Sequence, residues 1–252
     1  MTGAQLHGSA TLRAASVQTY AKIAGVVFLL SFVGGGIGEA YVPSQLIVAG
    51  NASATAHNII ASNQLFRLGF VAYLLEAFTD VALAFLLYVL LRPVHANLAF
   101  LAVLFRLMAT ATFAFGEVFY FTPSLLLGGD AYLKTFSPAQ LNSLALLSFN
   151  VYGFAGGFSQ VFYGIASIVL GYLMWRSGYL PRALGALWVL GGLGFMVSTL
   201  ALVLAPADAS PLLLVPQILA TLSLGLWLLV RGVDIGKWQE RGAVAAYASV
   251  PI

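Results

Sequence analysis

The stretch LLEAFTDVALAFLLYVLLR, residues 74–92, is long enough and apolar enough to form a helix that crosses a lipid bilayer. Before its terminal arginine it holds two charged residues, Glu76 and Asp80. An acid is costly inside a membrane, so two acids in one span are either paired, hydrated or functional. The stretch therefore predicts a membrane-spanning helix and, at the same time, a candidate polar site within it.

The composition of the whole chain favours the same class of protein. Of its 252 residues, 61% are hydrophobic and 8% are charged, and the mean hydropathy is +0.96. A soluble domain carries about 25% charged residues, so this chain cannot cover a water-facing surface. The chain has no cysteine, which excludes disulfides, thiolate metal sites and cysteine nucleophiles.

The apolar runs predict an all-α polytopic membrane protein, a bundle of six transmembrane helices. The predicted spans are residues 22–42, 64–91, 97–124, 148–175, 182–205 and 211–231. Residues 1–21 and 232–252 are then expected to be cytoplasmic N- and C-terminal tails, which precede and follow a transmembrane domain of residues 22–231. A short helix outside the membrane is expected at residues 51–60, before the second span.

Several turn residues mark the expected helix ends. Ser137-Pro138-Ala139-Gln140 matches a capping box with proline at the first helical position. Gly178 is placed to end one helix. The run that begins at Pro138 is too long for one crossing, so we expect a short outer helix, a bend near residues 152–153, and then the fourth span. Pro216 is expected to kink the sixth.

The positions of lysine and arginine predict the orientation. One side of the membrane carries most of them: Arg13, Lys22, Arg92, Arg176, Arg182, Arg231, Lys237 and Arg241. The other side has Lys134 alone. The positive-inside rule then places both termini in the cytoplasm, in agreement with an even number of spans. Because the basic residues lie at segment ends, the lipid bilayer is the expected partner and nucleic acid is not.

Three stretches resemble a known family. They are Phe66-Arg67-Leu68-Gly69-Phe70, the run from Asp80 to Val94, and Arg176 to Arg182. The chain resembles a widespread bacterial family of multi-pass membrane proteins that carry a domain of unknown function (DUF4386-like). The resemblance extends roughly from the first span to the fifth. It implies a protein of the bacterial cytoplasmic (inner) membrane, and it implies no activity, cofactor or catalytic residue.

The ionisable residues within the spans define the candidate site. Glu76 and Asp80 are four residues apart and share one face of the second helix with Tyr73. Arg106, Thr110 and Glu117 form one stripe on the third helix. Asp80 and Arg106 lie at similar depths, counted from the turn near Val94, so we predict an ion pair between them.

A second, outer cluster is predicted from Glu39, Arg67 and Glu117, although Glu39 and Arg67 could simply reach the membrane surface. Four acids in the spans face two arginines. Glu76 is the acid for which the pattern offers no cation, so we expect it to be neutral at rest and to be the better functional candidate.

The fourth span has a seam of small and polar residues at spacings of three and four. The seam consists of Asn150, Gly153, Gly157, Gln160, Gly164, Ser167 and Gly171. Small residues let membrane helices approach closely, so packing explains the seam. The alternative is that Asn150 and Gln160 line a polar cavity that faces Glu76.

The three histidines lie far apart along the chain, at positions 7, 57 and 95, so no metal site is predicted. A Gly-rich phosphate loop is also absent. The sequence leaves any cofactor unknown.

Three functions remain open. The first is binding or transport of a small solute or cation at a polar site built on Glu76, Asp80 and Arg106, with Tyr73, Thr110, Glu117, Asn150 and Gln160 around it. The second is a structural or regulatory subunit whose small-residue faces bind a membrane protein or a second copy. The third is an intramembrane enzyme that uses paired carboxylates on a lipid-like substrate.

Overall fold

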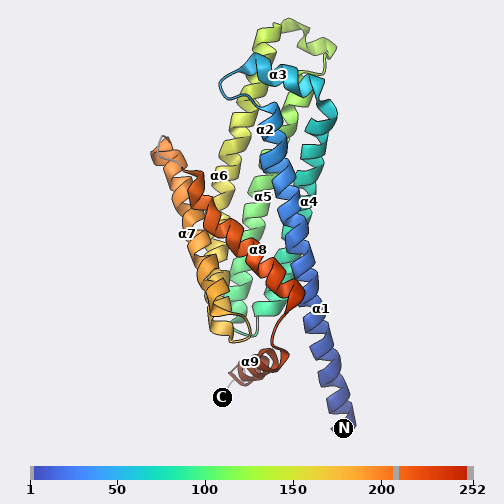
Figure 1. The fold of residues 1–252 in the computed structure, drawn as a ribbon, viewed down its shortest axis with the longest axis vertical. Coiled ribbons are helices and arrows are strands. Elements are labelled where there is room, and N and C mark those ends of the chain that lie inside the picture. Colours follow the sequence, from blue (N-terminus) through green and yellow to red (C-terminus); the bar gives the residue numbers. More distant parts are fainter. Residues whose placement is uncertain (1–2, 207–209, 249–252) are drawn as a thin grey trace. The chain divides into compact units, whose positions relative to one another are not determined.

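The computed structural model describes residues 3–206 and 210–248, which form helices and contain no strand (Figure 1). In chain order the helices are α1 (Gly3–Gly35), the π-helix η1 (Gly36–Tyr41), α2 (Val42–Leu46), α3 (Ala52–Ala61), α4 (Asn63–Leu91), α5 (Ala96–Leu126), the 3₁₀-helix η2 (Ala131–Thr135), α6 (Pro138–Ser177), α7 (Arg182–Leu204), the 3₁₀-helix η4 (Pro211–Leu214), α8 (Val215–Val230) and α9 (Ile235–Ala248).

Within the described residues, six helical segments are long and apolar enough to cross a membrane. They are Val17–Leu46, Asn63–Leu91, Ala96–Leu126, Pro138–Ser177, Arg182–Leu204 and Pro211–Val230. The predicted all-α architecture with six spans is confirmed. The short helix expected before the second span is α3, whose first turn is capped by Asn51, since its Oδ1 accepts from the Ala54 amide at 3.0 Å.

The first span differs from its prediction at both ends. Helix α1 already begins at Gly3, within the expected tail, and the helical path continues to Leu46 through η1. A π-helix inserts extra residues per turn and is frequent at functional sites. The glycine-rich run before Glu39 is the sequence feature that accompanies it.

The fourth span is one unbroken helix of 40 residues, so the separate outer helix expected after Pro138 is wrong. The predicted capping box is present: the Ser137 amide donates to Gln140 Oε1 at 2.8 Å, and the Gln140 amide donates to Ser137 Oγ at 3.3 Å. A break at Gly153 would leave backbone groups without partners in an apolar surrounding, which costs more than glycine in a helix. At about 1.5 Å per residue, the helix exceeds the membrane core.

The last span also differs from its prediction. Pro216 lies in the first turn of α8, after the 3₁₀-helix η4. Amide groups in a first turn make no hydrogen bond within the α-helix, so proline costs no such bond there. The expected mid-helix kink is therefore replaced by a junction between two helix types. Gly178, as predicted, ends α6 with a positive φ of 77°.

Contacts divide the chain into two compact units. Unit 1 consists of the residues through Leu29, Asp80–Leu107 and the residues from Gln160 onward; unit 2 consists of Leu30–Thr79 and Met108–Ser159. Helices α1, α4, α5 and α6 each contribute one part to each unit. All four tryptophans of the chain belong to unit 1 (Trp175, Trp188, Trp227 and Trp238).

Unit 1 is held together by close helix contacts at glycines. A Cβ built on Gly171 would lie 2.6 Å from the Gly185 carbonyl oxygen, and one on Gly164 would lie 2.6 Å from that of Gly192. These contacts join α6 to α7. Part of the predicted seam of α6 is therefore used for packing within the chain.

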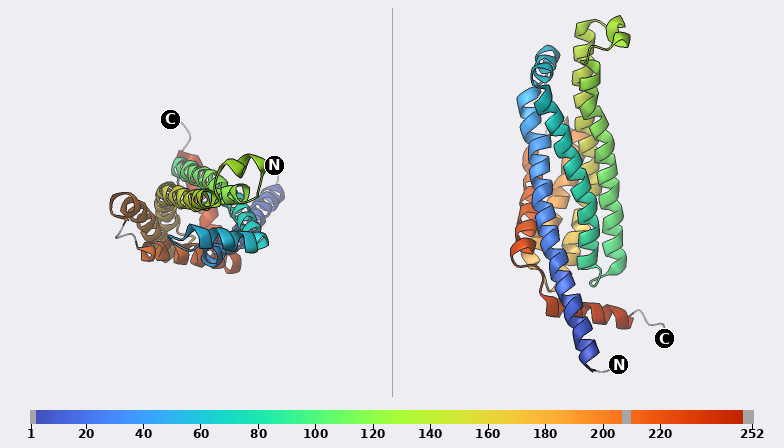
Figure 2. Two further views of the ribbon diagram at one scale, coloured as in Figure 1. Left: turned by 90° about the horizontal axis from the view of Figure 1, so that it is seen from above. Right: turned by 90° about the vertical axis from the view of Figure 1, so that its right-hand side faces the viewer.

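Helix α9 closes one end of unit 1, where Figure 2 shows it lying crosswise to the spans. Trp238 Nε1 donates to the Leu90 carbonyl at the end of α4 at 3.0 Å, and Arg241 donates to the Arg176 carbonyl on α6 at 3.0 Å. The Tyr179 hydroxyl also donates to the Leu90 carbonyl at 2.7 Å. Burial raises the pKa of Tyr179, so this donor keeps its proton.

Unit 2 has an aromatic core that joins α4, α5 and α6. The rings of Phe66 and Tyr120 are stacked with their centroids 5.0 Å apart, and Phe149 lies edge-on to both. Helix α1 and η1 approach α4 closely through Gly34 and Gly38, where a Cβ would lie 3.0 Å from the Ala72 carbonyl and 3.2 Å from the Gly69 carbonyl.

Candidate functional site

The residues predicted to form one polar site are divided between the two units. Unit 1 contains Asp80, Arg106 and Gln160. Unit 2 contains the others: Glu39, Arg67, Tyr73, Glu76, Thr110, Glu117 and Asn150. Each group is therefore described within its own unit.

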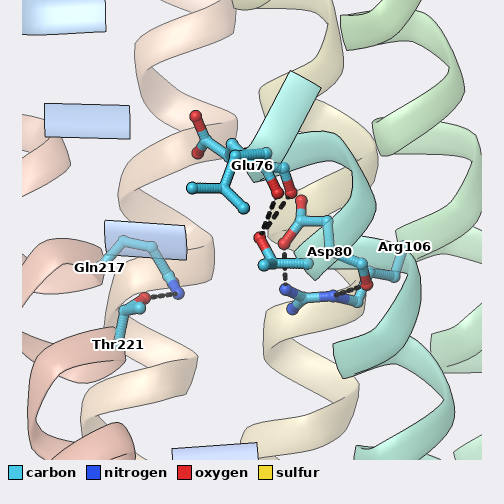
Figure 3. A network of polar contacts seen from close by, with 7 residues as sticks. Glu76, Asp80, Arg106, Gln217 and Thr221 are labelled. Atoms are coloured by element: carbon cyan, nitrogen blue, oxygen red, sulfur yellow. Dashed lines mark hydrogen bonds and ion pairs between the residues drawn. The ribbon is translucent and has the colours of Figure 1, made fainter. Parts of the chain in front are cut away.

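The predicted ion pair in unit 1 is confirmed. Arg106 Nη2 on α5 lies 2.5 Å from Asp80 Oδ1 on α4, and Arg106 Nε donates to the Asp80 carbonyl oxygen at 3.4 Å (Figure 3). The two side chains are 2% and 13% exposed. Two charged groups removed from water in this way stabilise each other, and the loss of either one leaves the other uncompensated.

Tyr163 on α6 completes the surroundings of Arg106. The guanidinium carbon lies 4.7 Å from the centroid of the Tyr163 ring, which is the geometry of a cation–π contact. The sequence analysis missed Tyr163. Its position three residues after Gln160 places it near the polar seam, and this spacing could have identified it. Gln160 itself is half-buried.

Unit 1 holds a second buried polar group that the sequence analysis missed, Gln217 at the start of α8. Its side chain is 2% exposed, and its Nε2 donates to Thr221 Oγ1 at 3.4 Å (Figure 3). The Oε1 atom of Gln217 has no hydrogen-bond partner in the part of the chain that the structure describes. It lies against Gly191, where a Cβ would come within 2.4 Å of it.

In unit 2, Tyr73 occupies the centre of the candidate site and is fully buried. Its ring lies 4.8 Å from that of Tyr120, 5.4 Å from that of Tyr152 and 5.7 Å from that of Phe113, measured between centroids. The Tyr152 hydroxyl donates to the Tyr73 hydroxyl. The Tyr120 hydroxyl donates to the Phe66 carbonyl oxygen at 3.3 Å.

Glu76 lies on the next turn of α4 after Tyr73 and is half-buried. Its carboxylate packs against Gly35 of α1, because a Cβ at that position would lie 3.0 Å from each of the two carboxylate oxygens. The neighbouring Gly36 has nothing within 4 Å of such a Cβ. Glycine at position 35 thus leaves the space that the Glu76 carboxylate occupies.

Glu117 on α5 is the most deeply buried acid of unit 2, with 2% of its surface exposed. Its Oε1 atom has no hydrogen-bond partner among the described residues. Phe113 and Tyr120 lie four residues before and three residues after it, and both contact Tyr73. Glu117 therefore shares the face of α5 that is directed toward Tyr73.

Glu39 belongs to η1 and is exposed. It interacts electrostatically with Glu117, Tyr73 and Tyr152. We refer to these neighbouring groups as the acid–tyrosine cluster, which consists of Glu39, Tyr73, Glu76, Glu117, Tyr120 and Tyr152.

The remaining predicted residues of unit 2 lie elsewhere or contribute less. Arg67 is exposed, and its Nε donates to Asn63 Oδ1 at 3.0 Å, one turn toward the start of α4. Asn150 is exposed on α6, which does not support a role in lining a cavity. Thr110 is buried on α5. The described residues of unit 2 include one lysine and one arginine, Lys134 and Arg67, and both are exposed. Since neither belongs to the acid–tyrosine cluster, the cluster is acidic.

The described residues contain no group of three or more histidine, cysteine, aspartate or glutamate side chains placed to hold a metal ion. The acid–tyrosine cluster can instead bind positive charge through its carboxylates and through the negative faces of its aromatic rings.

Comparisons with known proteins agree with this description of a membrane protein. Residues 23–232 match the family described as "Domain of unknown function (DUF4386)". A relative described as "Uncharacterized protein", from Archaeoglobus fulgidus, is 31% identical over 121 residues, which is 48% of this chain. The matched part spans 59% of the relative's length. No solved structure matches the chain.

Proposed function

Because the chain belongs to the family described as a domain of unknown function (DUF4386), we propose its function from the site itself: binding and transport of a small cation at the acid–tyrosine cluster. The protein is a multi-pass membrane protein. The observation that carries the proposal is Glu117, a buried carboxylic acid whose Oε1 has no hydrogen-bond partner among the described residues.

The physical reason is the cost of a buried negative charge. An ionised carboxylate without a positive partner in an apolar surrounding is strongly disfavoured, so it either takes up a proton or holds a cation. Glu117 and Glu76 would carry the charge, and Tyr73 would lie between them and the aromatic core. Binding of a cation would then release a proton, so cation binding and proton release would be coupled.

The Asp80–Arg106 pair has a different part in this proposal. Arg106 already has a carboxylate and a tyrosine ring as partners. The pair would hold α4 against α5 in unit 1 and leave ligand binding to the acids of unit 2. We place the protein in the bacterial cytoplasmic membrane with both termini in the cytoplasm, on the positions of its basic residues.

The test follows the protonation of the two acids by infrared difference spectroscopy of the purified protein at pH 7. Addition of a cation is expected to remove the band of a protonated carboxyl group and to release protons into a weakly buffered solution. Glu117→Gln and Glu76→Gln each remove part of the signal. Glu240→Gln, an exposed acid on α9, leaves it unchanged.

A pair of glycine variants tests the same site without a change of charge. Gly35→Ala places a methyl group against both oxygens of Glu76, whereas Gly36→Ala meets open space. We expect the first to weaken cation binding by about threefold or more, a loss of roughly 0.7 kcal/mol, and the second to have no effect. Equal behaviour of the two variants, together with no cation-dependent carboxyl band, would reject the proposal in favour of a structural subunit.

The alternatives predict other results. A subunit would bind its partner protein through the open part of the α6 seam at Gly153, because Gly164 and Gly171 are already in contact with α7. An enzyme acting on a lipid-like substrate would lose turnover in Glu76→Gln and Glu117→Gln without any proton release on cation addition.

A further inference from the structure

We infer that the cation bound by the acid–tyrosine cluster is an organic ammonium ion with an apolar body; this inference rests on the proposed function and names its substrate class. The basis is the kind of group that surrounds the acids. The residues that lie one turn away from the two acids along their helices include aromatic rings: Tyr73 precedes Glu76 on α4, and Phe113 and Tyr120, which both contact Tyr73, flank Glu117 on α5.

The rings pack into one aromatic cluster around Tyr73. Tyr120, Tyr152 and Phe113 contact Tyr73 directly, with centroids 4.8 to 5.7 Å away. Phe66 and Phe149 extend the cluster from Tyr120, with centroids 5.0 and 5.5 Å away. The faces of such rings attract ammonium groups, most strongly where water is excluded, and the same rings solvate the carbon substituents of the ligand.

A bare metal ion is less suited to this surrounding. Calcium and magnesium need six or more oxygen ligands, and the described residues provide no group of three metal-binding side chains. Two of the three tyrosine hydroxyls already donate to protein acceptors: that of Tyr152 to Tyr73, and that of Tyr120 to the Phe66 carbonyl. The aromatic faces thus supply much of what the cluster offers beyond its carboxylates.

Glu117 gives an independent indication of a ligand. It is 2% exposed, its Oε1 is without a hydrogen-bond partner in the described part of the chain, and it shares the face of α5 with the two rings that touch Tyr73. A carboxylate near aromatic rings can compensate a positive charge on a bulky, weakly hydrated cation.

The experiment measures binding of radiolabelled benzyltrimethylammonium to the full-length protein in detergent by equilibrium dialysis. This probe has a permanent charge and no hydrogen-bond donor, so it reports charge and ring contacts alone. We expect saturable binding that is weakened by lower pH and competed by other quaternary ammonium ions. Benzyl alcohol, the neutral control, and Na⁺ or K⁺ at the same concentration are expected not to compete.

Variants separate the carboxylate from the rings. Glu117→Gln is expected to weaken binding of the probe at least tenfold. Tyr152→Phe keeps the ring and is expected to bind within about twofold of the unchanged protein, whereas Tyr152→Leu loses at least about threefold. Tyr88→Leu, the same change at a half-buried tyrosine of unit 1, serves as the control. Thermal unfolding of each variant checks that it is folded.

The outcomes distinguish the two levels of the proposal. If Na⁺ or K⁺ removes the carboxyl band and the quaternary ion does not bind, cation binding stands and the organic substrate class is overturned. If neither kind of cation binds, both fall. If Tyr152→Leu does not fold, two other measurements replace it. Tyr152→Phe should still bind the quaternary ion in preference to Na⁺, and Glu117→Gln should lose this preference. If Glu117→Gln keeps the preference, the inference is overturned.

Discussion

At the scale of single residues, the structure makes the Asp80–Arg106 pair a strong determinant of stability. Both side chains are largely withdrawn from solvent, and Arg106 has Tyr163 below its guanidinium. A buried pair contributes little compared with two apolar residues, but breaking it leaves a charge without compensation.

We therefore predict that Asp80→Asn or Arg106→Gln alone lowers the free energy of unfolding by about 3–5 kcal/mol. The double variant should lose less than the sum of the two, because neither charge is left alone. Unfolding of the purified protein in mixed micelles with increasing denaturing detergent measures both. Arg92→Gln, at an exposed position after α4, is the control. Strict additivity would contradict a direct interaction.

At the scale of elements, glycines decide how closely α6 and α7 approach. A Cβ on Gly171 would lie 2.6 Å from a carbonyl oxygen and 2.8 Å from the Val189 amide nitrogen, and both are backbone atoms that cannot rotate away. Gly153, on the same helix, has nothing within 4 Å.

Gly171→Ala is accordingly expected to destabilise the protein by about 1–3 kcal/mol through overpacking. Gly153→Ala should be neutral or stabilising by up to about 1 kcal/mol, because alanine favours the helix. Thermal denaturation followed by circular dichroism compares the two. A similar loss in both variants would mean that helix propensity, and not the contact with α7, governs the effect.

Helix α9 provides a prediction about pH. The Lys237 amide donates to Asp234 Oδ1 at 3.2 Å, and Lys237 Nζ lies 3.3 Å from Oδ2. The hydrogen bond from the Lys237 amide holds the pKa of Asp234 below its ordinary value of 3.8, and the charged side chain of Lys237 lowers this pKa further. A lowered folded-state pKa means that the contribution of Asp234 is complete above 3.8 and is lost as the pH falls through the lower value.

A spin label on Ala243→Cys would report this change, since the chain has no other cysteine. The label should keep its mobility from neutral pH down to about pH 4 and become more mobile below it. Asp234→Asn can still accept the hydrogen bond but does not titrate, so this step should be absent. Persistence of the step in the variant would assign it to another group.

The elements also show what the sequence can predict. The number of spans, the capping box at Ser137 and the glycine at position 178 follow from composition and local hydrogen bonding, and they were predicted correctly. The continuity of α6 and the π-helix η1 were not, because both depend on whether neighbouring helices and lipid compensate for local glycine preferences. Helix α9 was expected as a tail, since its order comes from contacts with Leu90 and Arg176, far away in sequence.

The candidate site was predicted less completely than the fold. The facing positions of Asp80 and Arg106 followed from helical periodicity and the short turn between their helices. Tyr163, Gln217 and the aromatic partners of Tyr73 come from helices whose rotation about their axes the sequence does not define. Asn150 shows the same limit, because its position on the seam suggested an inward direction while the residue is exposed.

At the scale of the whole molecule, we predict that six spans leave both ends of the chain on one side of the membrane. Single cysteines at Ser53 and Ala131, which are exposed between spans, are expected to react with a membrane-impermeant thiol reagent added to intact cells. Ala243→Cys should react only after the membrane is opened. Reaction of all three from one side would contradict the six-span topology.

The location of every tryptophan in unit 1 has a practical consequence for spectroscopy. Light of a wavelength that tyrosine does not absorb excites indole alone, so the native fluorescence of this protein reports on unit 1. Tyr73, Tyr120 and Tyr152 of unit 2 do not contribute to that signal, whereas circular dichroism records the helices of both units. On heating, a difference between the tryptophan fluorescence and the circular dichroism of the unmodified chain would therefore show that the two units unfold at different temperatures.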